Sequence, residues 1–173
     1  MHPEHLLTFV ILPTLSYMGE KFNTPAAQQL LLATAAQESH CGHFLHQIGG
    51  PAVGIYQIEP ATFDDLEENY LKYEPSIARK VNELARSPAL TRKPGGEIHD
   101  KTSQLIGDLH YATAVARAQY YRFSEKLPEF DDFEAMWSYY KRYWNTDRGA
   151  ATRGEFKNNW KAFVAPSLHN RDV

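Results

Sequence analysis

The 173-residue chain has a single cysteine, Cys41, and its apolar N-terminal stretch covers only residues 6–15. One cysteine excludes a framework of intrachain disulfides, which fits a protein that folds in a reducing compartment. The apolar stretch is too short to cross a bilayer, contains Pro13 and has no Lys or Arg before it. We therefore expect no signal peptide and no membrane insertion, and a chain that is made in the cytoplasm.

The chain also lacks an excess of charge of either sign. Lys and Arg number 18 and Asp and Glu number 21, which gives a net charge of −3 with the two signs interspersed. Proteins that bind nucleic acid usually carry a basic face, so the composition argues against nucleic acid as a partner. Apolar residues make up 43% of the chain and aromatic residues 13%, as in globular proteins. We expect one domain over residues 1–173.

Alternating strand patterns are scarce, and apolar residues recur mostly at helical spacing. Prolines and glycines in residues 87–100 predict a surface loop, and residues 53–58 can form a small β-hairpin. The predicted fold class is mainly α, with at most that hairpin as β structure. The helices that we expect cover residues 5–18, 24–39, 62 onward, 76–86, 101–123, 131–144 and 152–164.

Local signals mark where several of these helices start or bend. Thr24 followed by Pro25 predicts a helix start, because threonine caps helices and proline fits the first helical position. Thr62 predicts another start, with acidic residues 64 and 65 in the first turn, where the helix dipole favours negative charge. Pro13 predicts a bend or interruption in the first helix.

Glu38 stands where the pattern of the second helix calls for an apolar residue. It shares a helical stripe with Leu31 and Ala35, which should face the core. Apolar surroundings and the negative end of the helix dipole would both raise the pKa of this carboxyl group. A carboxylic acid that stays protonated near neutral pH can act as a general acid. A glutamate that merely solvates the end of a helix fits the position equally well.

A glycine-hinged segment, Gly-Ile-Tyr-Gln-Ile-Glu-Pro-Ala-Thr at residues 54–62, follows after a short loop. Gly54 leaves room for a ligand or another backbone to come close. Gln57 offers both a donor and an acceptor, which suits a sugar hydroxyl or acetamido group. Alone, this segment would fit an ordinary loop with a solvated glutamine.

Together, Glu38-Ser39 and the segment at residues 54–62 resemble the signature of soluble lytic transglycosylases. That family has a lysozyme-like fold related to goose-type lysozyme, and its pattern is Glu-Ser followed by Gly-Leu-Met-Gln-Ile-x-Pro-x-Thr. In this chain Ile-Tyr replaces Leu-Met, and Glu59 replaces a commonly apolar residue. The order, the spacing and several of the identities match.

The resemblance implies that Glu38 is the catalytic acid and base and that Ser39 orients it. It implies further that Gly54, Tyr56 and Gln57 line a glycan groove, beside which the hairpin would lie. Tyr56 could stack on a sugar or simply pack.

The family's third element is a Tyr-Asn-x-Gly stretch on a late helix, which residues 144–149 match loosely. It implies that Tyr140 and Asn145 contact sugars or Glu38. Core packing of a helix rich in Trp and Tyr is the alternative.

Residues 39–58 contain no Asp or Glu, whereas goose-type lysozymes carry a second acid in this loop. The absence favours a mechanism with one acid, in which Glu38 serves first as acid and then as base and leaves a 1,6-anhydro ring on N-acetylmuramic acid. We therefore predict a peptidoglycan lytic transglycosylase. Glu59 is the carboxylate that keeps hydrolysis by a muramidase open. A lysozyme-like protein that binds glycan in a virion without cleaving it is the competing class.

We expect neither a metal nor another cofactor. His40, Cys41, His43 and His46 are close in sequence, but no CxxC or HExxH pattern accompanies them. A histidine-lined rim of the groove is the preferred interpretation. The expected partners are peptidoglycan strands and other lysis or virion proteins. We expect bacteriophage lysis or entry as the setting, with delivery to the cell wall by other components.

Overall fold

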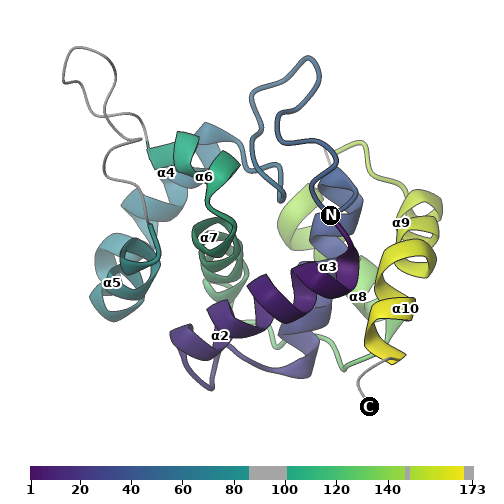
Figure 1. Cartoon of the computed structure of the whole chain (residues 1–173). Helices are drawn as coiled ribbons and strands as arrows, with labels where there is room; N and C mark the ends of the chain where they lie inside the picture. The colour runs from purple at the N-terminus through teal and green to yellow at the C-terminus, as the bar shows by residue number, and fades with distance from the viewer. Residues whose placement is uncertain (86–100, 147–148, 170–173) are drawn as a thin grey trace.

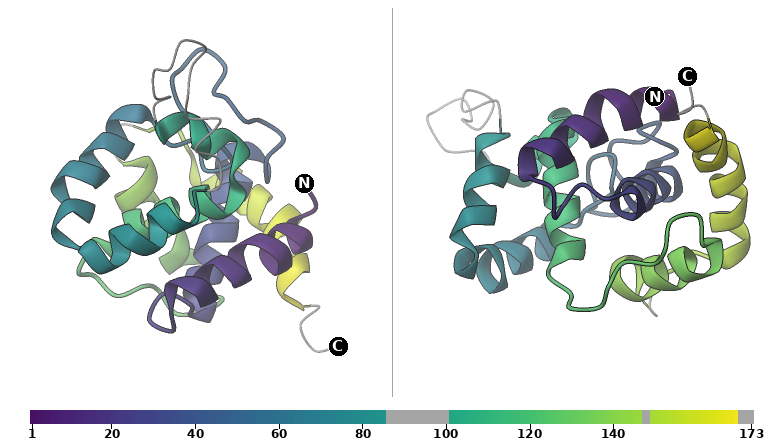
Figure 2. Two further views of the ribbon diagram at one scale, coloured as in Figure 1. Left: turned by 60° about the vertical axis from the view of Figure 1, so that its left-hand side comes forward. Right: turned by 90° about the horizontal axis from the view of Figure 1, so that it is seen from below.

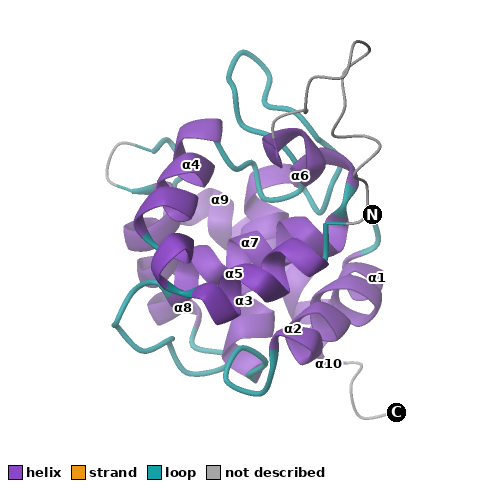
Figure 3. Cartoon of the chain, turned by 90° about the vertical axis from the view of Figure 1, so that its left-hand side faces the viewer, coloured by secondary structure: helices purple, strands orange, loops and turns teal. Residues whose placement is uncertain are grey.

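Helices make up nearly all the regular structure in the computed structural model, which describes residues 1–85, 101–146 and 149–169. Within these ranges, β structure is limited to two isolated bridges, His46 with Val53 and Val53 with Ile58, and Figure 3 shows only helices and loops. The mainly α prediction is thus confirmed, while the loop expected at 87–100 lies outside the described residues. The elements are α1 (Pro3–Leu6), the π-helical turn η1 (Leu7–Ile11), α2 (Leu12–Met18), α3 (Pro25–Ser39), α4 (Pro60–Asn69), the 3-10 turn η2 (Leu71–Tyr73), α5 (Pro75–Glu83), the 3-10 turn η3 (Lys101–Ser103), α6 (Gln104–Gly107), α7 (Leu109–Tyr121), α8 (Phe133–Tyr140), the π-helical turn η4 (Lys141–Asn145), α9 (Arg153–Asn159), the π-helical turn η5 (Trp160–Val164) and α10 (Ala165–His169).

Helix α3 is the centre of the arrangement. Figure 1 shows it between α4 and α5 on one side and α9 and α10 on the other, with α2 crossing in front. In Figure 2 the N-terminal helices, α7 and the C-terminal helices surround it. Helix α3 contacts α1, η1, α7, α8, α9 and η5. The buried apolar residues of all these elements form one contiguous cluster.

The sequence of α3 explains its central position. Thr24 caps the helix by accepting a hydrogen bond from the Ala27 backbone N–H at 3.2 Å, and Pro25 occupies the first turn, as predicted. Leu31 and Ala35 are both 0% exposed. The apolar and small residues of α3 are spread around its whole circumference, so the helix packs on all sides instead of along one stripe. Such a helix is a rigid base for the side chains at its end.

The start of α4 corrects one prediction. The helix begins at Pro60, with Glu59 in extended conformation at its N-cap, and not after Thr62. The residue before a proline avoids helical geometry and proline suits the first helical turn, so Pro60 sets the boundary. Asp64 and Asp65 therefore lie beyond the first turn, and Asp65 pairs with Arg122 at 2.6 Å.

Two other helices test the expected boundaries, and the first of them differs from the expectation. The long helix expected over residues 101–123 is broken between α6 and α7, where Asp108 leaves helical geometry and caps α7 by accepting from Tyr111 N at 3.1 Å. Aspartate is a favoured N-cap, so a new helix starts there. At Pro13 the backbone stays helical from η1 into α2, and the π-helical turn η1 directly before the proline is the local interruption of the α-helix that Pro13 predicts.

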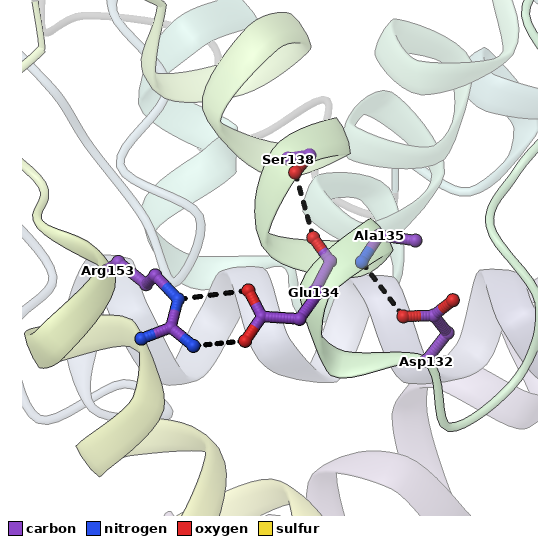
Figure 4. Close-up of polar contacts among 5 residues, drawn as sticks. All are labelled: Asp132, Glu134, Ala135, Ser138 and Arg153. Atoms are coloured by element: carbon purple, nitrogen blue, oxygen red, sulfur yellow. Dashed lines mark hydrogen bonds and ion pairs between the residues drawn. The ribbon is translucent and has the colours of Figure 1, made fainter.

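Helices α8 and α9 are tied together beside α3. Asp132 caps α8 by accepting from the Ala135 N–H at 3.0 Å, and Arg153 at the start of α9 grips both carboxylate oxygens of Glu134 (Figure 4). A two-point arginine–carboxylate pair fixes orientation as well as distance. Because this pair is at the surface, it orients the helices more than it stabilises them.

No helix in the described part of the chain is both long and apolar enough to span a membrane.

Candidate active site

Glu38 lies in the last turn of α3 and borders a groove of about 710 Å³. The walls come from the end of α3, the loop before α4, α8, η4 and α9. Amide side chains are prominent among the lining groups, and they can both donate hydrogen bonds to and accept them from a polar ligand. These amides are Gln37, Gln47, Gln57, Gln119, Asn145, Asn158 and Asn159.

Burial raises the pKa of Glu38 from its ordinary value of 4.5 to about 7. The opposing influence is a hydrogen bond from Tyr140 on α8, whose hydroxyl donates to Glu38 Oε1 at 2.5 Å. Desolvation therefore outweighs the bond that favours the charged form, and the predicted rise in pKa is confirmed. At neutral pH the group is divided between the acid and the carboxylate, so it can both give and accept a proton.

Tyr140 is 0% exposed, and burial together with the Glu38 carboxylate raises the pKa of its hydroxyl well above the usual range. The phenol therefore keeps its proton and acts as a donor. The predicted contact between Tyr140 and Glu38 is present, and Tyr140 borders the groove, but a side chain with no exposed surface offers nothing for a direct sugar contact in this conformation.

The Ser39 hydroxyl bonds to backbone groups and not to Glu38, and Ser39 is not among the residues that line the groove, so the direct orienting contact predicted for it is not observed. Its hydroxyl donates to the carbonyl oxygen of Ile55 at 2.6 Å and accepts from the Gly42 N–H at 2.8 Å. The side chain is 1% exposed. Ser39 therefore ties the glycine-hinged segment to the end of α3, and Tyr140 is the side chain that hydrogen-bonds Glu38.

Gly54 is needed for close packing, and it is not among the residues that line the groove, where the resemblance placed it. Its φ is +75°, and a Cβ atom there would lie 2.2 Å from the carbonyl oxygen of Leu105 in α6. The turn from Gly54 to Gln57 is closed by paired backbone hydrogen bonds of 3.0 Å between Val53 and Ile58. This turn is the small β element that we expected at residues 53–58.

Tyr56 is a core residue, which settles the alternative left open by the sequence. It is 0% exposed, its hydroxyl lies 3.2 Å from Thr113 Oγ1, and its ring meets Trp144 edge to face. Stacking on a sugar is therefore excluded in this conformation, because the ring is already enclosed.

Gln57 and Asn145 both border the groove, as predicted. The Gln57 amide donates to the Gly54 carbonyl at 2.7 Å, which holds the side chain against its own turn. The oxygen of Asn145 accepts from Lys141 Nζ at 2.6 Å. Both amides are thus fixed in orientation before a ligand arrives.

Two further carboxylates line the groove besides Glu38. Glu59 is exposed at the N-cap of α4 and makes no capping hydrogen bond with its side chain. Glu155 belongs to the capping box of α9, where its carboxylate accepts from the backbone N–H of Thr152 at 2.9 Å. Glu59 is therefore the more available of the two.

Several groove residues escaped the sequence reasoning. Asn159 donates to Gln37 Oε1 at 2.9 Å and so joins α9 to the end of α3, and Asn158 lies beside it. One signal was present: two adjacent asparagines are unusual inside a helix, because asparagine is a poor helix former. The pairing with a residue 122 positions away had no signal in the sequence.

The histidines near the acid are dispersed. His40 borders the groove and stacks on Phe163 at 5.7 Å, while His43 and His46 are exposed along the loop. Among the residues that the structure describes, no three His, Cys, Asp or Glu side chains are grouped for a metal ion. Cys41 is buried, and burial raises the pKa of its thiol to about 12, which disfavours the nucleophilic thiolate.

The chain matches no protein-family model, and comparisons with curated proteins and with solved structures find no significant match. The resemblance to lytic transglycosylases therefore depends on Glu38, Ser39 and the segment at residues 54–62.

Proposed function

We propose that the chain is a lysozyme-like lytic transglycosylase, which cleaves the β-1,4 bond between N-acetylmuramic acid and N-acetylglucosamine in peptidoglycan. The observation that carries the proposal is Glu38: a carboxyl group with a pKa of about 7, bonded to Tyr140, at the edge of an amide-lined groove. A general acid works best when its pKa lies near the working pH.

The proposed reaction uses Glu38 twice. Its acid form protonates the bridging oxygen, and the bond from that oxygen to C1 of muramic acid breaks. Its carboxylate form then takes the proton from the C6 hydroxyl of the same sugar, whose oxygen attacks C1. A 1,6-anhydro ring forms, Glu38 regains its proton, and no water is consumed. The hydroxyl of Tyr140 stabilises the carboxylate between the two steps.

Hydrolysis by a muramidase is the second candidate, and Glu59 is the observation that favours it. An inverting hydrolase needs a second carboxylate to activate water on the opposite face of the sugar. Glu59 lines the same groove and is exposed to water. The products distinguish the two reactions, because transglycosylase products are one water lighter than hydrolysis products.

The test is digestion of purified peptidoglycan by the wild-type protein, Glu38→Gln and Glu59→Gln, followed by mass spectrometry of the muropeptides. A transglycosylase gives anhydro ends, keeps its activity in Glu59→Gln and loses it in Glu38→Gln. Reducing ends that disappear in Glu59→Gln establish hydrolysis instead. Equal clearing by the wild type and Glu38→Gln refutes the assignment of Glu38.

The biological setting that we propose is cell-wall degradation during bacteriophage lysis or entry. A protein that only binds glycan in a virion is the alternative. It predicts that the wild type and Glu38→Gln sediment equally with peptidoglycan and that neither releases soluble fragments. Detection of the chain in purified virions would favour a role in entry over one in lysis.

A further inference from the structure

Gln37 in the last turn of α3 and Asn159 at the end of α9 join their side chains at the wall of the groove. Asn159 Nδ2 donates to Gln37 Oε1 at 2.9 Å, and both residues are half-buried and line the groove. Helix α9 packs against α3, so the pair is carried by two helices in contact (Figure 1). Within residues 1–85, 101–146 and 149–169, the structure gives neither side chain a second hydrogen-bond partner.

One hydrogen bond between two amides leaves a donor and an acceptor side by side. Each amide has an NH₂ group with two donors and an oxygen that accepts. Because the Asn159 NH₂ group and the Gln37 oxygen bond to each other, the Gln37 NH₂ group and the Asn159 oxygen remain for a ligand. Turning both amides over exchanges the roles of the two residues and leaves the same combination. The pair therefore suits a group that both donates and accepts.

A hydroxyl group fits this combination better than an acetamido group. A hydroxyl carries its donor and its acceptors on one oxygen. Its oxygen can accept from Gln37 Nε2 while its O–H donates to Asn159 Oδ1, which closes a ring of hydrogen bonds that reinforce one another. The N–H and the C=O of a trans acetamido group point in opposite directions, so two amides in contact cannot reach both.

A second contact between the same two parts of the chain lies about one helical turn further along. His40, the residue that caps α3, lines the groove, and its ring stacks on that of Phe163 in η5 with the centroids 5.7 Å apart. The groove thus has an aromatic surface next to the amide pair. Apolar and aromatic walls with a few placed polar groups are typical of sites for small ligands.

The position of the pair beside the acid selects the hydroxyl. Gln37 and Glu38 are consecutive residues, and both line the groove. In the proposed reaction Glu38 faces the oxygen that bridges C1 of N-acetylmuramic acid and C4 of N-acetylglucosamine. The C3 hydroxyl of that N-acetylglucosamine is on the ring carbon next to C4, whereas its C6 hydroxyl is one carbon further away. The C6 hydroxyl of N-acetylmuramic acid is the nucleophile and gives its proton to Glu38, so it does not need the pair.

We propose that Gln37 and Asn159 bind the C3 hydroxyl of the N-acetylglucosamine that leaves, and thereby select which of the two alternating β-1,4 bonds is cut. N-acetylmuramic acid differs from N-acetylglucosamine by a lactyl ether on this same oxygen. An ether oxygen has no hydrogen to donate to Asn159. A site that hydrogen-bonds a hydroxyl strongly rejects an analogue without it, because the polar groups of the site are left unpaired. The inference rests on the proposed function, since it assigns a subsite of that reaction.

The experiment is the binding of three sugars to the full chain, followed by NMR through the side-chain amide signals of Gln37 and Asn159. The sugars are methyl N-acetyl-β-glucosaminide, its 3-O-methyl ether and its 6-O-methyl ether. The signals are assigned from their absence in Gln37→Met and Asn159→Ala. Asn82→Ala is the matched control, because Asn82 is an exposed asparagine on α5 and is not among the residues that line the groove.

We expect the parent sugar and the 6-O-methyl ether to shift both signals with similar affinity, and the 3-O-methyl ether to bind at least about tenfold more weakly. In Gln37→Met and in Asn159→Ala, the remaining signal of the pair should report about tenfold weaker binding of the parent sugar and no preference over the 3-O-methyl ether. On peptidoglycan, kcat/KM should fall about tenfold in both variants. Asn82→Ala should bind and react like the wild type.

Equal affinity for the parent sugar and the 3-O-methyl ether overturns the proposal, as does a parent sugar that shifts neither signal or a loss of binding in the 6-O-methyl ether alone. Variants that melt at a lower temperature and keep the preference also overturn it, and they leave the pair as a contact between α3 and α9. The three sugars are compared on the wild type, so the comparison decides even where a variant fails to fold. It also needs no cleavage: a wild type that shows the preference but does not cut peptidoglycan refutes the proposed function alone, and an active wild type without the preference refutes the subsite alone.

Discussion

Replacing Glu38 by glutamine should make the protein more stable at neutral pH while removing its activity. The pKa of Glu38 rises from 4.5 to about 7 on folding, because burial disfavours the charged form. The folded state therefore holds its proton more tightly than the unfolded state. The contribution of Glu38 to the free energy of unfolding is greatest where both states are protonated, below about pH 4.5. This contribution is lost as the pH rises through about 7. Glutamine is neutral at every pH and escapes this loss.

The expected gain follows from the two pKa values. Proton linkage gives about 3 kcal/mol at pH 7, less than about 1 kcal/mol at pH 5 and close to zero at pH 4. Glutamine also keeps an oxygen for the Tyr140 hydroxyl, so that the hydrogen bond to Tyr140 is retained. The free energy of unfolding should be measured by urea denaturation at these three pH values.

Glu68→Gln is the control for this experiment, because Glu68 is an exposed glutamate on α4, away from the groove. Its free energy of unfolding should differ from that of the wild type by less than about 0.5 kcal/mol at each pH. The reasoning is refuted if Glu38→Gln is no more stable than the wild type at pH 7, or if its gain is the same at pH 4. Either result would mean that burial does not disfavour the Glu38 carboxylate.

Three other variants test separate parts of the site. Tyr140→Phe removes the donor to Glu38, so the pKa of the acid should rise and kcat fall about 10- to 100-fold, measured as a pH profile on peptidoglycan. Gly54→Ala should lower the free energy of unfolding by more than about 2 kcal/mol in urea, since it combines a positive φ with a backbone clash. Ser39→Ala should cost about 1–3 kcal/mol in the same assay by leaving a buried carbonyl unpaired, yet lower kcat less than about tenfold, and a larger loss of kcat at full stability would restore a direct role for Ser39.

The sequence predicted those parts of the site that depend on neighbours along the chain. The start of α3 follows from Thr24 and Pro25, and the burial of Leu31 and Ala35 follows from helical spacing. The same spacing placed Glu38 at the edge of the core. These signals depend on residues that are close in sequence, so contacts with distant parts of the chain change their outcome little.

What the sequence did not predict depends on contacts between distant residues. Asn159 meets Gln37 across 122 positions, and the periodicity of a helix shows which face is buried but not which side chain it will meet. The boundary at Thr62 failed for a local reason, since two helix-start signals competed and Pro60 prevailed. Asp108 shows the same competition inside a pattern that looked continuous.

The residues predicted to contact substrate fall into two groups, those that the packing of their segment requires and those that line the groove. Gly54 and Tyr56 belong to a segment whose turn must pack against α6 and α7, so their identities are explained by packing alone. Gln57 is the member of the segment that remains at the groove. A motif of this kind therefore contains more structural residues than ligand contacts.

The groove combines a rigid base with a wall that is held by specific hydrogen bonds. Glu38 projects from α3, whose burial on all sides fixes the position of the acid. The opposite wall depends on the π-helical turn η4, a geometry that often occurs at functional sites. There Lys141 and Asn145 are joined within one widened turn, and Gly149 lies against both of them. Because the acid is fixed by packing, whereas Asn145 at the groove wall is held by its hydrogen bond from Lys141, substitutions in η4 should alter catalysis more than stability, and substitutions in the core of α3 should do the reverse.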